Sequence, residues 1–141
     1  MKLRIMCIGK LKSRPIADLV SDYLARLKHY HNSNVEIFKD DEHAIAAVGA
    51  TDFFVVMDEG GKKMSSVKLA GFLEERANAA TKNLCFFIGG PDGVSSQARS
   101  RANLVLSLSD MTFPHELAQA ILLEQLYRAS SINRNEPYHR V

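Results

Sequence analysis

A chain of 141 residues, 46% hydrophobic and 24% charged, has the composition of an ordinary globular protein, so we expect residues 1–141 to form one domain. No apolar run reaches the roughly 18 residues that a membrane-spanning helix needs, which excludes a membrane partner. Basic residues interrupt the first apolar segment, which excludes a secretory signal and makes a cytoplasmic protein the expectation. The net charge of +2 says little about partners.

The first half of the chain alternates between strand and helix patterns. An apolar run predicts a strand over residues 2–9, and Pro15 opens an amphipathic helix over 15–27. A short strand over 35–38 comes next. A short helix over 40–48 follows, with an aspartate as its N-cap.

The second half continues the alternation. An almost wholly apolar run predicts a central, buried strand over 53–57, followed by a loop over 58–62. Serine-capped helices over 65–80 and 95–102 alternate with strands over 84–88 and 104–108. A long helix over 115–131 ends the series.

This order predicts an α/β fold, with a largely parallel sheet of about five strands and helices on both faces. The last helix is apolar around most of its circumference, a pattern that favours burial on more than one side. We therefore expect a homodimer with this helix in the interface. Cys7 and Cys85 fall inside predicted strands and are expected to be buried free thiols. No Cys-x-x-Cys or histidine cluster indicates a metal site.

Three predicted loops leave the carboxyl ends of strands, after Met57, Ile88 and Leu108. Ligands of open α/β sheets bind at such strand ends, so the loops are expected to converge on one pocket. The turn from Gly89 to Gly93 lets the backbone adopt a positive φ and lets a ligand approach the main chain. It lacks the spacing of a phosphate-binding loop, and its alternative interpretation is an ordinary tight turn. The mixture of hydroxyls and apolar groups after Leu108 favours an uncharged heterocycle.

The two ends of the chain are basic, and the last residues include an aromatic ring and an imidazole. Tyr138 suits stacking on an unpaired base, and the arginines suit phosphate binding. A solvated, frayed terminus is the alternative interpretation. His115 stands at a predicted helix start, where capping is as reasonable as catalysis. A catalytically silent α/β module that binds nucleic acid or a nucleotide fits the charge and the glycine turn equally well.

Four motifs, in order, resemble those of SPOUT-class RNA methyltransferases, and the similarity extends over essentially the whole chain. They are Phe-Ile-Gly-Gly-Pro-Asp-Gly from Phe87, Leu-Ser-Leu-Ser-Asp-Met-Thr-Phe-Pro-His from Leu106, Leu-Glu-Gln-Leu-Tyr-Arg-Ala from Leu123, and Pro-Tyr-His from Pro137. More narrowly, they resemble the small family that methylates N3 of a pseudouridine in large-subunit (23S) ribosomal RNA.

The resemblance implies a C-terminal trefoil knot, a homodimer with sites near the subunit interface, and S-adenosylmethionine as the cofactor. It places the cofactor contacts on Met57, Gly89, Leu108, Ser109, Asp110, Met111, Thr112 and Phe113. The segment between the second and third strands is shorter than in relatives, which affects any substrate contact made there.

The residues of the tail then suggest a mechanism of direct methyl transfer to a ring nitrogen. Because the imide N–H of the base must lose its proton, His139 is expected to be the general base, with Tyr138 positioning the target. Arg128, Arg134 and Arg140 are expected to bind RNA phosphates. The partner is expected to be large-subunit ribosomal RNA within the ribosome.

Overall fold

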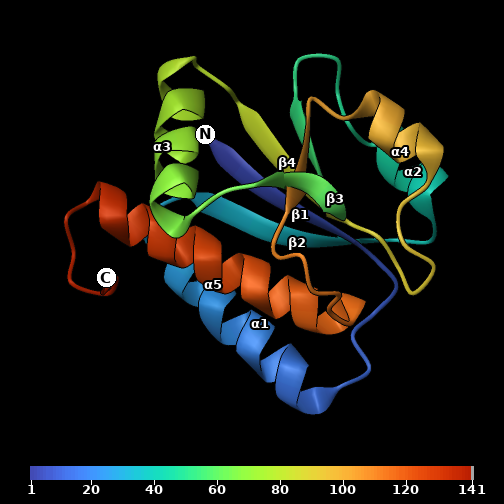
Figure 1. The fold of residues 1–141 in the computed structure, drawn as a ribbon, viewed down its shortest axis with the longest axis horizontal. Coiled ribbons are helices and arrows are strands. Elements are labelled where there is room, and N and C mark those ends of the chain that lie inside the picture. The colour runs from blue at the N-terminus through green and yellow to red at the C-terminus, as the bar shows by residue number, and fades with distance from the viewer. Residues whose placement is uncertain (141) are drawn as a thin grey trace.

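The structure, a computed structural model, describes residues 1–140. Within them, five strands form one parallel sheet in the order β2-β1-β4-β3-β5, which confirms the expected α/β class (Figure 1). The strands are β1 (Lys2–Ile8), β2 (Asn32–Phe38), β3 (Phe53–Lys63), β4 (Asn83–Ile88) and β5 (Leu104–Ser107). The helices are α1 (Arg14–Leu27), α2 (Asp41–Ala46), α3 (Ser66–Asn78), α4 (Ser96–Arg101) and α5 (His115–Asn133).

Helices cover both faces of the sheet, and each face has its own core (Figure 1). Side chains alternate along a strand, so Leu3 and Ile5 of β1 face the larger core beneath α1, α3 and α5. Met6 of the same strand faces the smaller core, where Phe54 and Phe87 pack beneath α2 and α4. No helix of residues 1–140 is long and apolar enough to cross a bilayer.

Helix α5 is apolar around its circumference because three elements of its own chain surround it. It packs on the sheet and lies between α1 and α3 (Figure 1). Leu122, Leu123 and Leu126 are fully buried in this way. The apolar pattern that led us to expect a dimer therefore has an explanation within one chain, and it no longer argues for a second subunit.

Strand β3 is longer than its sequence predicts. The expected loop over 58–62 is wrong, because the strand continues to Lys63. Leu106 of β5 pairs with Met57 and again with Lys62, after a register shift. A strand residue has two pairing sides, so the two halves of β3 lie along opposite edges of β5. Gly61 permits this path, since a Cβ there would lie 2.7 Å from the Val105 carbonyl.

The ends of several other elements differ slightly from expectation. Strand β2 begins three residues earlier than predicted, at Asn32. Helix α1 begins at Arg14, and Ser13 is its N-cap. The caps of α2, α3 and α4 are Asp40, Ser65 and Ser95, each of which accepts a backbone N–H of the first turn, as expected.

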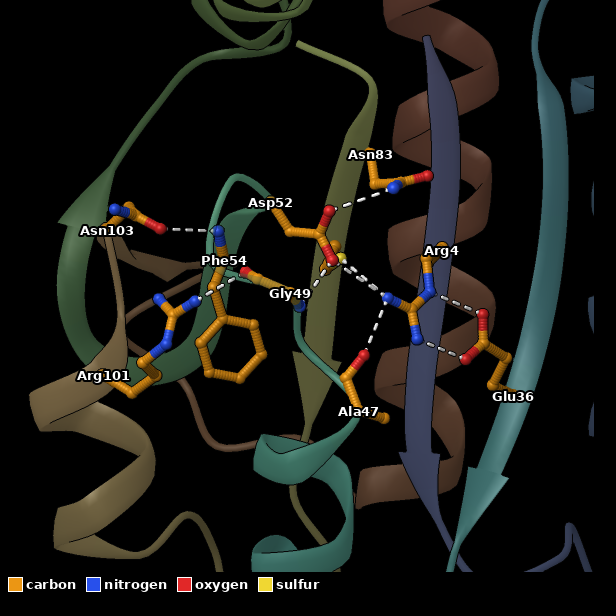
Figure 2. A network of polar contacts seen from close by, with 10 residues as sticks. Arg4, Glu36, Ala47, Gly49, Asp52, Phe54, Asn83, Arg101 and Asn103 are labelled. Atoms are coloured by element: carbon orange, nitrogen blue, oxygen red, sulfur yellow. Dashed lines mark hydrogen bonds and ion pairs between the residues drawn. The ribbon is translucent and has the colours of Figure 1, made fainter.

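A half-buried polar network joins four strands of the sheet (Figure 2). Arg4 of β1 donates two hydrogen bonds to the Glu36 carboxylate of β2, at 2.7 and 2.8 Å. Its remaining nitrogen donates to the Ala47 carbonyl and to Asp52 just before β3, and Asp52 also accepts the Asn83 amide of β4 at 2.9 Å. The network therefore holds the amino ends of these strands in register.

Both cysteines are buried and free, as expected. Burial raises the pKa of the Cys7 thiol to about 12. Burial also raises the pKa of Cys85 to about 11, although the Arg4 charge beside it acts in the opposite direction. Because the thiolate is the reactive form, these are core side chains and not nucleophiles.

Candidate functional site

A cavity of about 600 Å³ lies at the carboxyl ends of β3, β4 and β5. The three loops expected to converge do so here, and the first turn of α5 closes the cavity. Every residue that the resemblance assigns to the cofactor lines it, with the exception of Asp110. These residues are Met57, Gly89, Leu108, Ser109, Met111, Thr112 and Phe113.

The turn after β4 is tightly closed on itself. A Cβ at Gly89 would lie 2.6 Å from the Gly93 carbonyl oxygen, so only glycine fits this position. The expected positive φ falls on Gly93, at 80°, and neither Gly89 nor Gly90 adopts one. The turn therefore presents a compact strip of backbone to the cavity at the end of β4.

The loop after β5 is shaped by its own serine hydroxyls. Ser107 Oγ donates to the Ser109 carbonyl at 2.8 Å, and Ser109 Oγ accepts the Met111 N–H at 3.0 Å. These bonds turn the chain so that Met111 reaches the rim of the cavity with 74% of its surface exposed. An exposed thioether at a cavity rim is available to pack against a ligand.

The second half of β3 is fastened to this loop by two side-chain contacts. Lys63 pairs with Asp110 at 2.6 Å, and the Thr112 hydroxyl donates to Glu59. Asp110 is thus directed towards the strand, which explains why it stands apart from the other assigned cofactor residues. Glu59 and Asp58 line the cavity beside Met57. Asp58 is paired with Arg99 of α4 at 2.9 Å, so the acidic edge of this rim lies at Glu59.

Several residues that line the cavity were not among the predicted site residues. His115 lines the cavity as the first residue of α5, while Pro114 occupies the N-cap position without a side-chain bond. His115 therefore does not have the capping role considered for it. Glu116, also in the first turn of α5, accepts the backbone N–H groups of Lys12 and Ser13 at 3.0 Å each, which ties α5 to the start of α1. The position of Asp58 and Glu59 directly after an apolar strand was the signal for the acidic edge.

The tail residues expected to be catalytic lie near the other end of α5 (Figure 1). Tyr138 and His139 contact Glu124 and Arg128 of that helix, and neither lines the cavity. With a rise of about 1.5 Å per residue, the helix axis from His115 to Arg128 is about 20 Å long. One chain therefore does not bring the tail and the cavity together.

The charged groups of the tail cluster, which comprises Glu124, Arg128, Tyr138 and His139, are paired with one another. Tyr138 donates to Glu124 at 2.7 Å, and Arg128 pairs with the same carboxylate at 2.8 Å. Burial, with further contributions from the Tyr23 and Glu124 contacts, raises the pKa of Tyr138 above its usual value. Of the expected phosphate ligands, Arg128 is half-buried and engaged by Glu124, whereas Arg134 and Arg140 are exposed.

Within residues 1–140, no group of three or more histidine, cysteine, aspartate or glutamate side chains is arranged to hold a metal ion.

Residues 1–139 match a family model described as "Predicted SPOUT methyltransferase". A protein named ribosomal RNA large subunit methyltransferase H, from Coprothermobacter proteolyticus, is 41% identical over 140 residues, covering 99% of this chain and 100% of that one. A protein of the same name from Christiangramia forsetii is 37% identical over 155 residues, covering 99% of each.

A solved structure of a probable methylase family protein from Haemophilus influenzae Rd KW20 is similar in fold, with a TM-score of 0.56 and 10% identity. The match covers 94% of this chain and 66% of that protein. At this identity the likeness concerns the fold alone.

Proposed function

The chain belongs to the SPOUT methyltransferase family, and we propose that it uses S-adenosylmethionine to methylate N3 of a pseudouridine in large-subunit ribosomal RNA. The relatives at 41% and 37% identity carry names that specify a ribosomal RNA large subunit methyltransferase. The pseudouridine and its N3 position are inferred from the four sequence motifs. Since ribosomes are assembled and used in the cytoplasm, we place the activity there.

The cavity at the three strand ends is the observation that carries this proposal. Its volume of about 600 Å³ lies within the range of small-molecule sites, about 300–1,000 Å³. Backbone groups of the Gly89 turn and of the loop after β5 provide donors and acceptors for an adenine ring. Leu108, Met111 and Phe113 provide apolar contact area. The residues present therefore fit S-adenosylmethionine.

When bound, S-adenosylmethionine supplies an electrophilic methyl group on a sulfonium sulfur. The task of the protein is then to align that carbon with the attacking nitrogen, and good alignment contributes roughly 7–11 kcal/mol to such reactions. The Gly89 turn and the Leu108–Phe113 loop orient the cofactor from two sides of the cavity. The Glu59 carboxylate at this rim is suited to the positive charge that the cofactor carries before transfer, whereas the Asp58 charge is already paired with Arg99.

We propose that the target base is bound by Tyr138 and His139 of a second copy of the chain. The length of α5 separates these residues from the cavity of their own subunit, so a homodimer completes the site. Arg134 and Arg140, which are exposed beside the tail, then bind phosphates of the RNA, and Arg128 supports them from α5. The trefoil knot implied by the motifs belongs to the same proposal, since a knotted C-terminal segment would fix α5 beside the cavity.

Calorimetric titration with S-adenosylhomocysteine tests the cofactor part of the proposal. The parent chain is expected to bind, and Phe113→Ala is expected to bind at least about tenfold more weakly, because a buried aromatic contact is worth more than about 1.4 kcal/mol. Val67→Ala, which truncates an exposed residue of α3 that does not line the cavity, is the matched control.

Methyl transfer from labelled cofactor to ribosomes, with mass-spectrometric mapping of the product base, tests the substrate. Failure of the parent to bind the cofactor in the presence of ribosomes would exclude the proposed activity.

A further inference from the structure

The tail is held on α5 by a chain of polar contacts that starts at Glu124. Its carboxylate accepts the Tyr138 hydroxyl at 2.7 Å and an Arg128 N–H at 2.8 Å. Another nitrogen of the same guanidinium lies 3.1 Å from Nδ1 of His139. The guanidinium also stacks over the Tyr138 ring, 4.7 Å from its centroid. Both tail residues are therefore fixed by one ion pair of α5.

The contact between Arg128 and His139 determines which nitrogen of the imidazole carries the proton. A guanidinium has only N–H donors, so Nδ1 of His139 must accept. The neutral ring then carries its proton on Nε2. A protonated ring would direct an N–H at the guanidinium and would break this contact. Within residues 1–140, the contact at Nδ1 is the one hydrogen bond that the His139 ring makes, so Nε2–H is the group that remains for a ligand.

We propose that His139 acts on the target base as a hydrogen-bond donor through Nε2–H, with Glu124 and Arg128 as positioning residues. This inference rests on the proposed function and deepens it. It replaces the general-base role that the sequence alone favours, because an imidazole whose Nδ1 is engaged and whose Nε2 is protonated has no lone pair to offer.

The donor role suits the chemistry of an imide. Loss of the N3 proton spreads negative charge onto the two flanking carbonyl oxygens, and a fixed donor beside one oxygen stabilises that anion. The proton leaves to water or hydroxide. The N3 electron pair forms the new bond to the methyl carbon as the carbon–sulfur bond breaks, and the sulfur keeps that electron pair as a neutral thioether.

The protonation pattern of His139 tests the geometry without any assay of activity. Long-range ¹⁵N–¹H correlation spectra at neutral pH are expected to give an unprotonated Nδ1 and a protonated Nε2 for this ring. The charged and titratable groups that surround it are Glu124 and Arg128 of α5, Tyr138 of the tail and Tyr23 of α1. Arg128→Gln should shift the ring towards a mixture of tautomers. A protonated Nδ1 in the parent chain would overturn the proposal.

Two substitutions of His139 then distinguish a hydrogen-bond donor from a general base. Glutamine retains an N–H near the position of Nε2 but has no basic nitrogen, whereas alanine removes both. His139→Gln is expected to keep kcat within about tenfold of the parent, and His139→Ala to lose about 10²- to 10³-fold, as for loss of one fixed donor. His29→Ala, an exposed histidine after α1, should leave kcat unchanged.

An equal loss of kcat in His139→Gln and His139→Ala, with cofactor binding intact, would overturn the donor role alone. No methylation by the parent chain would overturn the proposed function and the donor role together. The effect of Glu124→Gln separates positioning from folding. A lowered kcat with unchanged KM and unchanged thermal unfolding supports positioning, whereas a change in unfolding alone contradicts it.

Discussion

At the scale of single residues, Gly89 and Gly93 share one turn but meet different steric demands. Gly93 adopts a positive φ of 80°, with open space where a Cβ would be. Gly89 has an ordinary backbone conformation but lies against the carbonyl of Gly93. The first demand is conformational and the second is a matter of space, so the two positions respond differently to substitution.

Gly89→Ala is expected to lower the free energy of unfolding by about 1–3 kcal/mol, because its Cβ would force the turn backbone apart. Cofactor affinity should fall with it, since the turn lines the cavity. Gly71→Ala is the matched control. Position 71 lies in α3 with nothing within 4 Å of a Cβ, so alanine should stabilise by about 0.5–1 kcal/mol. Urea unfolding measures both, and a stable Gly89→Ala variant would contradict the steric argument.

The place of the candidate cofactor site was predictable from the strand pattern, because three loops follow directly after apolar strand runs, whereas its individual residues were assigned from the family resemblance. Met57, Gly89 and Leu108 stand at strand ends that a parallel sheet brings to one edge. The orientation of Asp110 was not predictable, since it depends on Lys63, and that lysine lies in a strand that the sequence does not indicate. The tautomer of His139 likewise depends on a contact with a residue eleven positions earlier in the chain.

At the scale of elements, the Arg4 network ties β1 to its neighbours by charge as well as by backbone pairing. The hydrogen bond from Arg4 is the main cause that lowers the pKa of Glu36. Burial tends to raise the pKa of Asp52, but hydrogen bonds from Asn83 and Gly49 and the Arg4 charge outweigh it. Both carboxylates therefore have lower pKa values in the folded protein than in the unfolded chain.

A carboxyl group whose pKa is lowered by folding stabilises the fold at pH values above its unfolded pKa, about 4. This contribution is lost as the pH falls towards the pKa of the group in the folded protein. The free energy of unfolding should therefore decline below about pH 4. Arg4→Met should cost about 3 kcal/mol at pH 7, since it leaves two half-buried carboxylates unpaired, and should flatten the acid decline. Arg14→Met, which removes an exposed i,i+4 pair, should cost less than about 0.5 kcal/mol. Chemical denaturation across pH 3–7 gives both quantities.

The extension of β3 shows why some elements escape prediction. Asp58-Glu59-Gly60-Gly61-Lys62 has the composition of a turn, and local preference alone makes it a loop. Pairing with β5 overrides that preference, and Gly61 is present because Val105 leaves no space for a side chain. The alternation of the remaining strands and helices was predictable because their apolar periodicity agrees with their place in the sheet.

At the scale of the whole molecule, α5 connects two sites that one chain keeps apart. Its first turn borders the cavity, and its second half carries Glu124 and Arg128 of the tail cluster. Neither the distance between them nor the wrapping of α5 by α1 and α3 was evident from the sequence, because both depend on which helices pack together. A site assembled from two subunits follows if both ends serve one reaction.

Complementation tests that arrangement directly. At a cofactor concentration well below the Kd of Phe113→Ala, this variant and His139→Ala should each be strongly impaired alone. An equimolar mixture that exchanges subunits should regain activity, because one of the two sites in a mixed dimer is intact. Light scattering should give a mass of about twice 15.7 kDa for the parent. A monomer that retains full activity would contradict the shared site.

The bend of β3 around β5 affects the tendency of the protein to aggregate at high concentration. A strand at the rim of a sheet exposes unpaired amides and carbonyls that recruit strands from other molecules and start aggregation. Lys62 and Lys63 occupy that rim beside β5, and lysine is the side chain that most discourages such pairing. Within residues 1–140 this leaves β2 as the open rim. The detour after Met57 that shapes the cavity thus also disfavours the addition of a foreign strand at the β5 rim.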